Sequence, residues 1–182
     1  MKIGIVIKGE TFSNKWILHW TSLMSSLVSD NTHAISVLTQ NYFVCDDNFK
    51  NFCKDLDKVF FISNKTMISK EIFDSLVDLT QTSVMSAMIV GNSIKHIRAR
   101  ENDTDKNEIS VEDILKWQKE SQSEHTQVFS THTDCTCIPI HVASLLQFGT
   151  NDDTLFNSLK GAGVDVYINN RLKVNYEMNL LI

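Results

Sequence analysis

The neighbouring carboxylates Asp152 and Asp153 are a pair of residues whose type could carry out acid–base chemistry. A carboxylate held beside a bound alcohol can remove its proton, which is the task of a general base. The same pair also suits the first turn of a helix, because acidic side chains there complement the helix dipole and Asn151 or Asp152 can act as the N-cap. Residue chemistry alone leaves both roles open.

Basic side chains that could bind a diphosphate occur at two places. Lys65 follows a short apolar run, and His96, Arg98 and Arg100 place three basic residues within five positions. Such side chains pair well with phosphate oxygens, but they are also ordinary in solvated loops and at strand ends. The chain contains no GxxxxGK[ST] phosphate loop, no GxGxxG dinucleotide loop and no GxSxG nucleophile elbow.

The four cysteines favour reduced thiols over a metal site. Cys135 and Cys137 are separated by one residue and have histidines nearby, which raises the question of zinc. Structural zinc sites use wider cysteine spacings and a second pair of ligands, which Cys45 and Cys53 do not supply. Alternation along a strand would place both thiols of the CxC segment on one face, where they can simply pack.

The elements that must position these residues alternate in type over the first half of the chain. Apolar runs predict strands over residues 2–7, 34–38, 58–62 and 84–90. Helical spacing predicts helices capped by Ser13, over residues 42–53, and from Ser69 to about residue 79. This order predicts a mostly parallel sheet covered by helices, with ligands at the carboxyl ends of the strands. The loops at those ends are residues 8–12, 39–41 and 63–67.

The second half has a polar stretch at residues 98–107 and then further elements. We predict helices from Ser110 to about residue 120 and from residue 151 or 152 to 160. Four more strands are predicted over residues 127–131, 134–138, 164–168 and 172–176. The whole chain, residues 1–182, is expected to be one domain.

Composition restricts the classes of partner. With 182 residues and a net charge of −5, the chain lacks the basic balance of a nucleic-acid-binding protein, so nucleic acid is a disfavoured partner. No apolar run is long enough to span a bilayer and no signal peptide is recognisable, so we expect a cytoplasmic protein with no membrane partner. One proline, 3 arginines against 14 lysines, and 15 asparagines are typical of an AT-rich bacterial or viral genome, and a viral source would mean the host cytoplasm.

Several segments, in order and with similar spacing, resemble the small GT-A glycosyltransferases, which are nucleotide-sugar transferases with a Rossmann-like sheet. The segment I-G-I-V-I-K-G-E-T-F resembles the first strand and base-binding loop, and Q-N-Y-F-V at residues 40–44 resembles the R-N-x-x-V helix start. Residues 59–76 resemble the stretch that carries the DxD metal motif. Residues 135–142 and 148–177 resemble the strand before the catalytic helix and the segment gEDxxF…gHe.

The resemblance implies a single Rossmann-like GT-A domain, with a nucleotide-binding half at residues 1–92 and an acceptor and catalytic half at residues 93–182. It places Asp153 at the catalytic base and Asp152 at the acidic residue before it. The nucleotide-sugar-binding residues that it implies are Lys8, Gly9, Glu10, Thr11, Gln40, Asn41, Ser63, Lys65 and Tyr176.

The departures from the family pattern concern the metal site. Ser63 and Lys65 stand where the DxD aspartates would be, Tyr176 replaces the terminal histidine, and Gln40 replaces an arginine. Because Mg²⁺ and Mn²⁺ need hard oxygen ligands, this degenerate DxD motif predicts no divalent metal cofactor. Lys65 would then supply the positive charge.

The resemblance therefore implies a metal-independent, inverting glycosyltransferase that moves a sugar from a nucleoside diphosphate sugar to a hydroxyl acceptor. The alternative is a catalytically inactive relative used as a binding or structural subunit, in a homo- or hetero-oligomer. An unrelated α/β protein is a third reading. The sugar, the base and the acceptor stay open at this stage.

Overall fold

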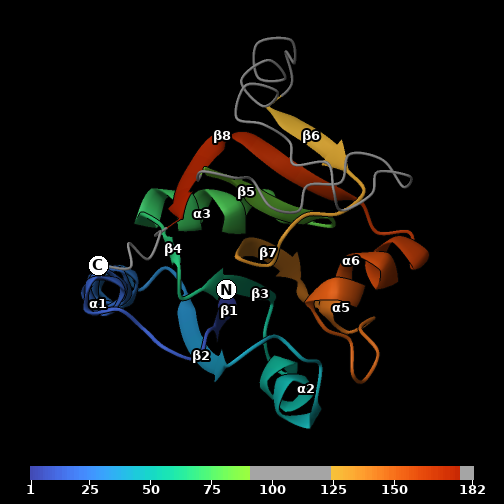
Figure 1. Ribbon diagram of the computed structural model, residues 1–182, viewed down its shortest axis with the longest axis horizontal. Helices are drawn as coiled ribbons and strands as arrows, with labels where there is room; N and C mark the ends of the chain where they lie inside the picture. The colour runs from blue at the N-terminus through green and yellow to red at the C-terminus, as the bar shows by residue number, and fades with distance from the viewer. Residues whose placement is uncertain (91–123, 177–182) are drawn as a thin grey trace.

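The computed structural model describes residues 1–90 and 124–176, which form an α/β fold around one eight-stranded sheet (Figure 1). The predicted helix from Ser110 to residue 120 lies outside the described residues, as do the polar stretch 98–107 and the basic residues His96, Arg98 and Arg100. The strands are β1 (Lys2–Lys8), β2 (Ala34–Gln40), β3 (Lys58–Ser63), β4 (Thr66–Met67), β5 (Val84–Val90), β6 (His125–Val128), β7 (Cys135–Pro139) and β8 (Val166–Tyr176). The helices are α1 (Asn14–Asp30), α2 (Asp47–Cys53), α3 (Lys70–Leu79), α5 (Ile140–Ala143) and α6 (Asp152–Gly161).

The strand order is β2-β1-β3-β7-β5-β8-β4, and β6 pairs with β8 outside this path. β1 is parallel to β2 and β3, and β5 is parallel to β8. β7 lies between β3 and β5 and is antiparallel to both, so β3 and β5 run in the same direction but are not paired with each other. β1, β2, β3, β5 and β8 thus share one direction, and β4, β6 and β7 run against them. The predicted Rossmann-like α/β class with a mostly parallel sheet is confirmed.

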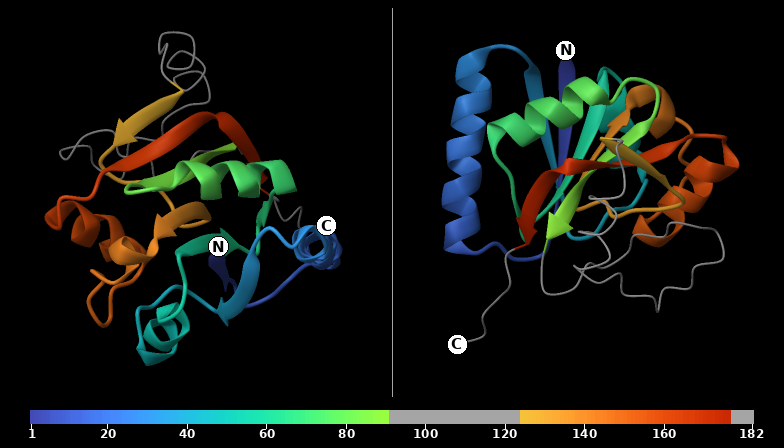
Figure 2. Two further views of the ribbon diagram at one scale, coloured as in Figure 1. Left: turned by 180° about the vertical axis from the view of Figure 1, so that it is seen from behind. Right: turned by 90° about the horizontal axis from the view of Figure 1, so that it is seen from above.

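Helices cover both faces of the sheet. One face packs on α2, α5 and α6, and the opposite face packs on α1 and α3 (Figures 1 and 2). β3 is buried along its whole length, and β1 is buried from Ile3 onward. A strand that meets apolar partners on both sides needs an unbroken apolar run, which explains why these strands were recognisable in the sequence.

The first three helices begin at side-chain caps. The side chains of Ser13, Asp46 and Ser69 each accept a hydrogen bond from the backbone N–H three residues later, over 3.1, 2.8 and 3.4 Å. Each cap satisfies one of the backbone donors that a helix leaves unpaired at its start. The predicted starts of α1 and α3 are confirmed.

The prediction of a helix from residue 42 is wrong, because α2 begins only after its cap at Asp46. Val44 instead forms an isolated antiparallel bridge with Asn151, and Phe43 is fully buried in the core. Helical spacing of the aromatic residues therefore did not reveal that the first of them belongs to an extended segment. This segment ties the connection after β2 to the start of α6.

The boundaries of the later strands also differ from the prediction. β6 lies at His125–Val128 rather than at residues 127–131, and β7 begins one residue later than predicted. The two strands expected at residues 164–168 and 172–176 are one strand, β8, which bulges where its pairing with β5 steps from Asn169 to Lys173. The Asn169 side chain fills the bulge by accepting hydrogen bonds from the N–H groups of Arg171 and Leu172.

Candidate active site at the carboxyl ends of the strands

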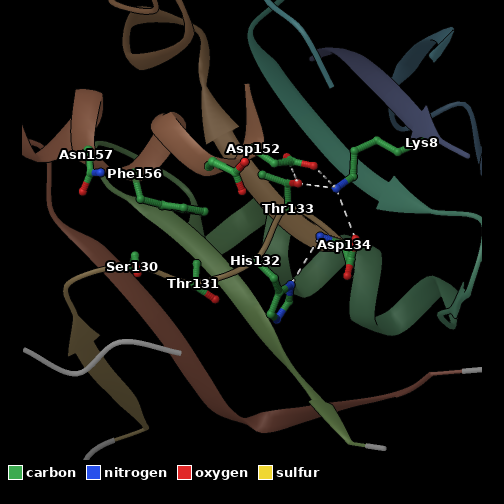
Figure 3. A pocket seen from close by; sticks show the side chains of 10 residues that line it. Lys8, Ser130, Thr131, His132, Thr133, Asp134, Asp152, Phe156 and Asn157 are labelled. Carbon is green, nitrogen blue, oxygen red and sulfur yellow. Dashed lines mark hydrogen bonds and ion pairs between the residues drawn. The ribbon is translucent and has the colours of Figure 1, made fainter. Parts of the chain in front are cut away.

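Lys8, the last residue of β1, carries a buried ammonium group surrounded by oxygen atoms (Figure 3). Its Nζ lies 2.9 Å from Asp152 Oδ2 and 3.1 Å from Asp134 Oδ1, and it donates a hydrogen bond to the Thr133 hydroxyl. A lysine ammonium has three N–H donors, so these three oxygens engage all of them. Pairing on this scale compensates for the loss of water around a side chain that is only 10% exposed.

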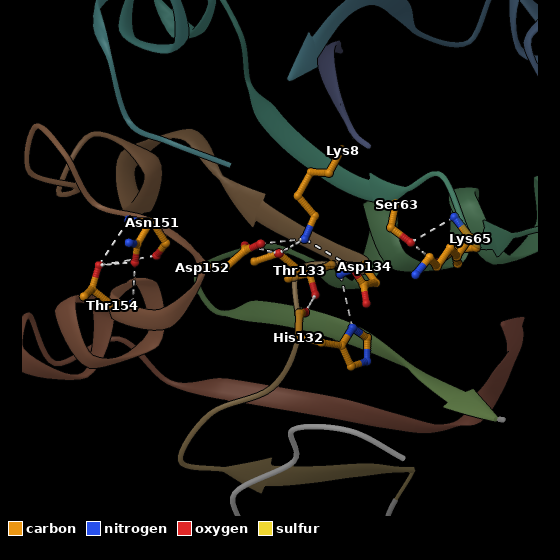
Figure 4. A network of polar contacts seen from close by, with 11 residues as sticks. Lys8, Ser63, Lys65, His132, Thr133, Asp134, Asn151, Asp152 and Thr154 are labelled. Carbon is orange, nitrogen blue, oxygen red and sulfur yellow. Dashed lines mark hydrogen bonds and ion pairs between the residues drawn. The ribbon is translucent and has the colours of Figure 1, made fainter. Parts of the chain in front are cut away.

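Asp152, the first residue of α6, has both carboxylate oxygens engaged as well. Oδ2 pairs with Lys8, and Oδ1 accepts a hydrogen bond from the Thr133 hydroxyl (Figure 4). The resulting network joins the end of β1, the turn before β7 and the start of α6. Asp152 is therefore built into the structure that holds these three elements together.

Asp153 differs from its neighbour in being exposed and in lining a pocket. It forms no hydrogen bond or ion pair within the described part of the chain. The position of Asp153 is set by the helix start, where the Asn151 side chain accepts a hydrogen bond from the Thr154 N–H and the Asn151 N–H donates to the Thr154 hydroxyl, both over 3.1 Å. Such a reciprocal capping box defines how the first turn enters the site.

The pocket has a volume of about 520 Å³ and opens beside the Lys8 network (Figure 3). Ten residues line it: Lys8, Ser130, Thr131, His132, Thr133, Asp134, Asp152, Asp153, Phe156 and Asn157. His132 is buried at the turn before β7, and its Nδ1 accepts a hydrogen bond from the Asp134 N–H over 3.3 Å. The volume is within the range of small-molecule sites, although the described lining is mainly polar.

The predicted nucleotide-binding loops meet at the same edge of the sheet. The Gly9 N–H donates to the Gln40 carbonyl over 2.9 Å, and the Asn64 N–H donates to the Lys8 carbonyl over 2.7 Å. The Asn64 side chain also donates to the Thr11 carbonyl. These bonds bring the loops after β1, β2 and β3 together, with Glu10 and Asn41 exposed beside them. The Gln40 side chain itself donates to the Val44 carbonyl over 3.1 Å.

The turn that replaces the DxD motif lies next to Lys8. Ser63 is the register partner of Lys8, and its buried hydroxyl is hydrogen-bonded to the Thr66 hydroxyl over 2.8 Å. The Lys65 N–H donates to the Ser63 hydroxyl over 3.3 Å, and the Lys65 side chain is exposed. The backbone of Tyr176 pairs with Thr66, so both halves of the inferred metal site meet at this turn.

The residues at this turn do not suit a divalent cation. Mg²⁺ and Mn²⁺ prefer hard, preferably anionic, oxygen ligands. Ser63 offers only a hydroxyl that is already hydrogen-bonded, and Lys65 adds a positive charge. Within residues 1–90 and 124–176, no group of three or more His, Cys, Asp or Glu side chains is placed to hold a metal.

The cysteines of the CxC segment are packed in the core. Cys135 and Cys137 are fully buried in β7, and burial raises the pKa of both thiols, that of Cys137 to about 12. A thiol that resists deprotonation is a poor metal ligand, since the thiolate is the binding form. The geometry agrees with the expectation of reduced thiols.

Sequence reasoning missed Thr133 and Asp134 as site residues. They belong to the polar segment just before β7, where the sequence pattern predicts only a strand that begins at residue 134. Because β7 runs antiparallel to β3, its amino end comes to the carboxyl end of that strand and reaches Lys8. The available signal was the polar run S-T-H-T-D directly before an apolar strand.

Comparison with known proteins supports the fold without defining a family. No family model and no curated protein matches the sequence. A solved structure of GalNAc-T7 with UDP, GalNAc and Mn²⁺ is similar, with a TM-score of 0.51 and 9% identity over 100% of this chain and 44% of that one. The inositol-1-phosphate CTP transferase of T. maritima aligns with a TM-score of 0.45 and 12% identity, over 97% of this chain and 89% of that one.

The chain spans less than half the length of the GalNAc-T7 chain that it matches. At this identity the similarity concerns the fold alone, which is a Rossmann-like fold of the GT-A type. In the described segments, none of the helices is both long and apolar enough to cross a membrane.

Proposed function

We propose that this protein is a transferase that uses a nucleoside diphosphate sugar as donor and a hydroxyl group as acceptor. The observation that carries the proposal is the meeting, at one sheet edge, of the loops after β1, β2 and β3 with an exposed carboxylate, Asp153, that lines a pocket. Ligands of parallel sheets bind at the carboxyl ends of the strands, where these residues lie.

We assign the nucleotide to the side of the site formed by Gly9, the Gln40–Asn41 segment and the turn at Ser63–Lys65. These are residues that the resemblance assigns to the nucleotide, and the exposed Lys65 side chain would place its ammonium toward the diphosphate. Lys8 takes a supporting role, because its three donors are already engaged by protein oxygens.

In the proposed step, Asp153 accepts the proton of the acceptor hydroxyl as its oxygen attacks the anomeric carbon. The new carbon–oxygen bond forms as the bond to the diphosphate breaks, and the diphosphate leaves with the electron pair. Attack from the face opposite the leaving group inverts the anomeric configuration. Lys65 would offset the charge that develops on the diphosphate. We expect this step to need no divalent metal.

The experiment compares the wild-type protein with Asp153→Asn and with Asp78→Asn, an exposed carboxylate on α3 outside the pocket. Hydrolysis and transfer are measured with a panel of labelled nucleotide sugars, and binding of nucleoside diphosphates is measured by thermal shift. Loss of the base should lower turnover by roughly 10²–10⁴-fold with nucleotide binding unchanged, whereas Asp78→Asn should behave as wild type.

Four results would contradict this proposal or part of it. Equal turnover in the wild type and Asp153→Asn would remove Asp153 from the mechanism. A large loss of nucleotide binding on addition of EDTA would refute metal independence. Nucleotide binding without turnover in any protein would favour the inactive binding subunit, and no stabilisation by any nucleoside diphosphate would refute the donor class.

A further inference from the structure

The described lining of the pocket beside Asp153 carries an excess of negative charge. Asp134, Asp152 and Asp153 contribute three carboxylates to its described lining, against the single ammonium of Lys8. Lys8 is shared between the first two of these, which leaves Asp153 exposed and without a cationic partner in the described part of the chain. An anionic ligand would have to lose water while approaching like charge, which opposes its binding.

Apart from His132, the other described lining residues are uncharged and rich in hydrogen-bonding groups. Ser130, Thr131 and Asn157 offer hydroxyl and amide groups, and Phe156 forms an apolar wall (Figure 3). Thr131 is 4% exposed, and its hydroxyl oxygen has no hydrogen-bond partner in the described residues. An unsatisfied buried hydroxyl costs free energy, which a polar ligand in the pocket could recover.

The donor diphosphate does not fit this lining. It would bring negative charge to a pocket that already has an excess of it, and Lys8 has no proton left to donate to a phosphate oxygen. The pocket therefore belongs to a different ligand from the one assigned to the turn at Ser63–Lys65.

We propose, building on the function proposed above, that this pocket receives the acceptor and that the acceptor is an uncharged saccharide. Carboxylates, hydroxyls and an amide are the groups that hydrogen-bond sugar hydroxyls, and an apolar wall suits the C–H face of a sugar ring. A volume of about 520 Å³ lies within the range of small-molecule sites. The negative charge of the described lining opposes the binding of acidic saccharides, nucleic acids and phosphorylated acceptors.

The test uses simple glycosides without any nucleotide, so that it does not depend on turnover. Methyl glucoside, methyl galactoside and methyl mannoside are each compared with the corresponding methyl uronide, which replaces the hydroxymethyl group by a carboxylate. Binding is followed by saturation-transfer NMR at neutral pH and low salt. At least one neutral glycoside should bind, and its uronide should bind at least tenfold more weakly.

Variants assign the binding to this pocket. Asp153→Asn removes one negative charge and should therefore reduce the difference in affinity between a glycoside and its uronide. Raised salt should reduce the same difference in the wild type. Asn157→Trp places a large ring at an exposed helix position on the pocket wall and should abolish glycoside binding. Asp78→Asn is the control that should change neither result.

The inference is overturned if a uronide binds as well as its neutral partner, or if no neutral glycoside binds at tens of millimolar. The inference would also be overturned if saturating UDP displaced the glycoside and Asn157→Trp abolished UDP binding as well. The pocket would then hold the diphosphate. Failure of nucleotide binding in the thermal-shift assay, with glycoside binding intact, would refute the donor assignment instead.

Discussion

Lys8 concentrates the electrostatics of the site in one side chain. Its ammonium is the only described cation that lines the pocket, and it compensates two carboxylates at once. The Asp152 side chain is 40% exposed, so water also stabilises its charge, whereas the Lys8 side chain has little access to solvent. Removing the Lys8 ammonium should therefore lower the free energy of unfolding by more than the loss of a surface ion pair does, and by less than the loss of a fully buried one.

We predict that Lys8→Met lowers the free energy of unfolding by about 2 kcal/mol at neutral pH. The flexible methionine keeps the volume of the stem but leaves Asp134 and Asp152 uncompensated. Urea denaturation measures the loss, and the double variant Lys8→Met/Asp152→Asn should recover part of it, because one of the two facing charges is gone. Additive losses in the double variant would show that Lys8 does not act through Asp152.

Gly9 is needed for the close approach of the turn after β3. A Cβ at this position would lie 2.3 Å from Asn64 Cγ, and the backbone φ of +150° is one that side chains disfavour. Asn64 cannot simply swing away, since its amide donates to the Thr11 carbonyl. Gly9→Ala should therefore destabilise the fold by about 2 kcal/mol.

A second variant separates the two causes of this cost. In Gly9→Ala/Asn64→Ala the steric contact is relieved while the backbone strain remains, so thermal denaturation should show partial recovery. Full stability of Gly9→Ala alone would mean that Asn64 does not pack against the Gly9 backbone.

At this scale, the sequence identified single residues better than their partnerships. Lys8 and Asp152 were both expected at the site, one as a ligand-binding residue and the other as a catalytic one. Their ion pair joins positions 144 residues apart, and nothing local in the sequence records such a contact. Asp134 was missed for the same reason, because only the antiparallel course of β7 brings it to Lys8.

Among the elements, α6 has the most direct bearing on the proposed chemistry, because its first turn carries Asp153. We predict that Asn151→Ala lowers the stability of the protein by about 1 kcal/mol, since it removes the acceptor for the Thr154 N–H. Asn151→Ser can still cap the helix and should retain most of the stability of the wild type. Thermal denaturation of both variants checks the prediction, and equal losses would show that the capping oxygen contributes nothing.

The positions of helices and strands could be predicted where the local sequence pattern determines them. The arrangement that depends on pairing between distant strands could not. Buried strands such as β3 are apolar throughout, and Ser69 is a recognisable cap, so both were found within a residue or two. The insertion of β7 between β3 and β5 depends on which edges meet, a property that an apolar run does not encode. The sequence pattern predicts a helix at Phe43 where the chain is extended, because a buried aromatic residue fits a helix and a strand equally well.

Across the whole molecule, the sheet separates two apolar clusters. One includes Phe43 and Cys45 and packs under α2, α5 and α6, and the other includes Trp16, Cys135 and Cys137 and packs under α1 and α3. A single domain should lose both clusters together, because the strands between them are shared. The thiols provide one reporter on each side.

Alkylation of the thiols should report this cooperativity. Burial raises the pKa of Cys45 and of Cys135, and raises the pKa of Cys137 to about 12. At pH 8 a thiol with a pKa near 12 is about 10⁻⁴ ionised, whereas an unfolded cysteine is about one quarter ionised. Reaction with iodoacetamide therefore requires opening of the structure, and stability should fall above about pH 8.5, where only the unfolded thiols release protons.

We predict that Cys45 and Cys137 become alkylated at the same rate in moderate urea, and that both rates follow the global free energy of unfolding. Peptide mass spectrometry after a timed pulse resolves the two sites. The alkylation rate of each thiol in the fully denatured chain is its intrinsic rate, and dividing by it corrects for local sequence effects. A slower rate at one thiol throughout the urea series would mean that its face of the sheet survives when the other opens, and that the chain contains two cooperative units in place of the single domain expected over residues 1–182.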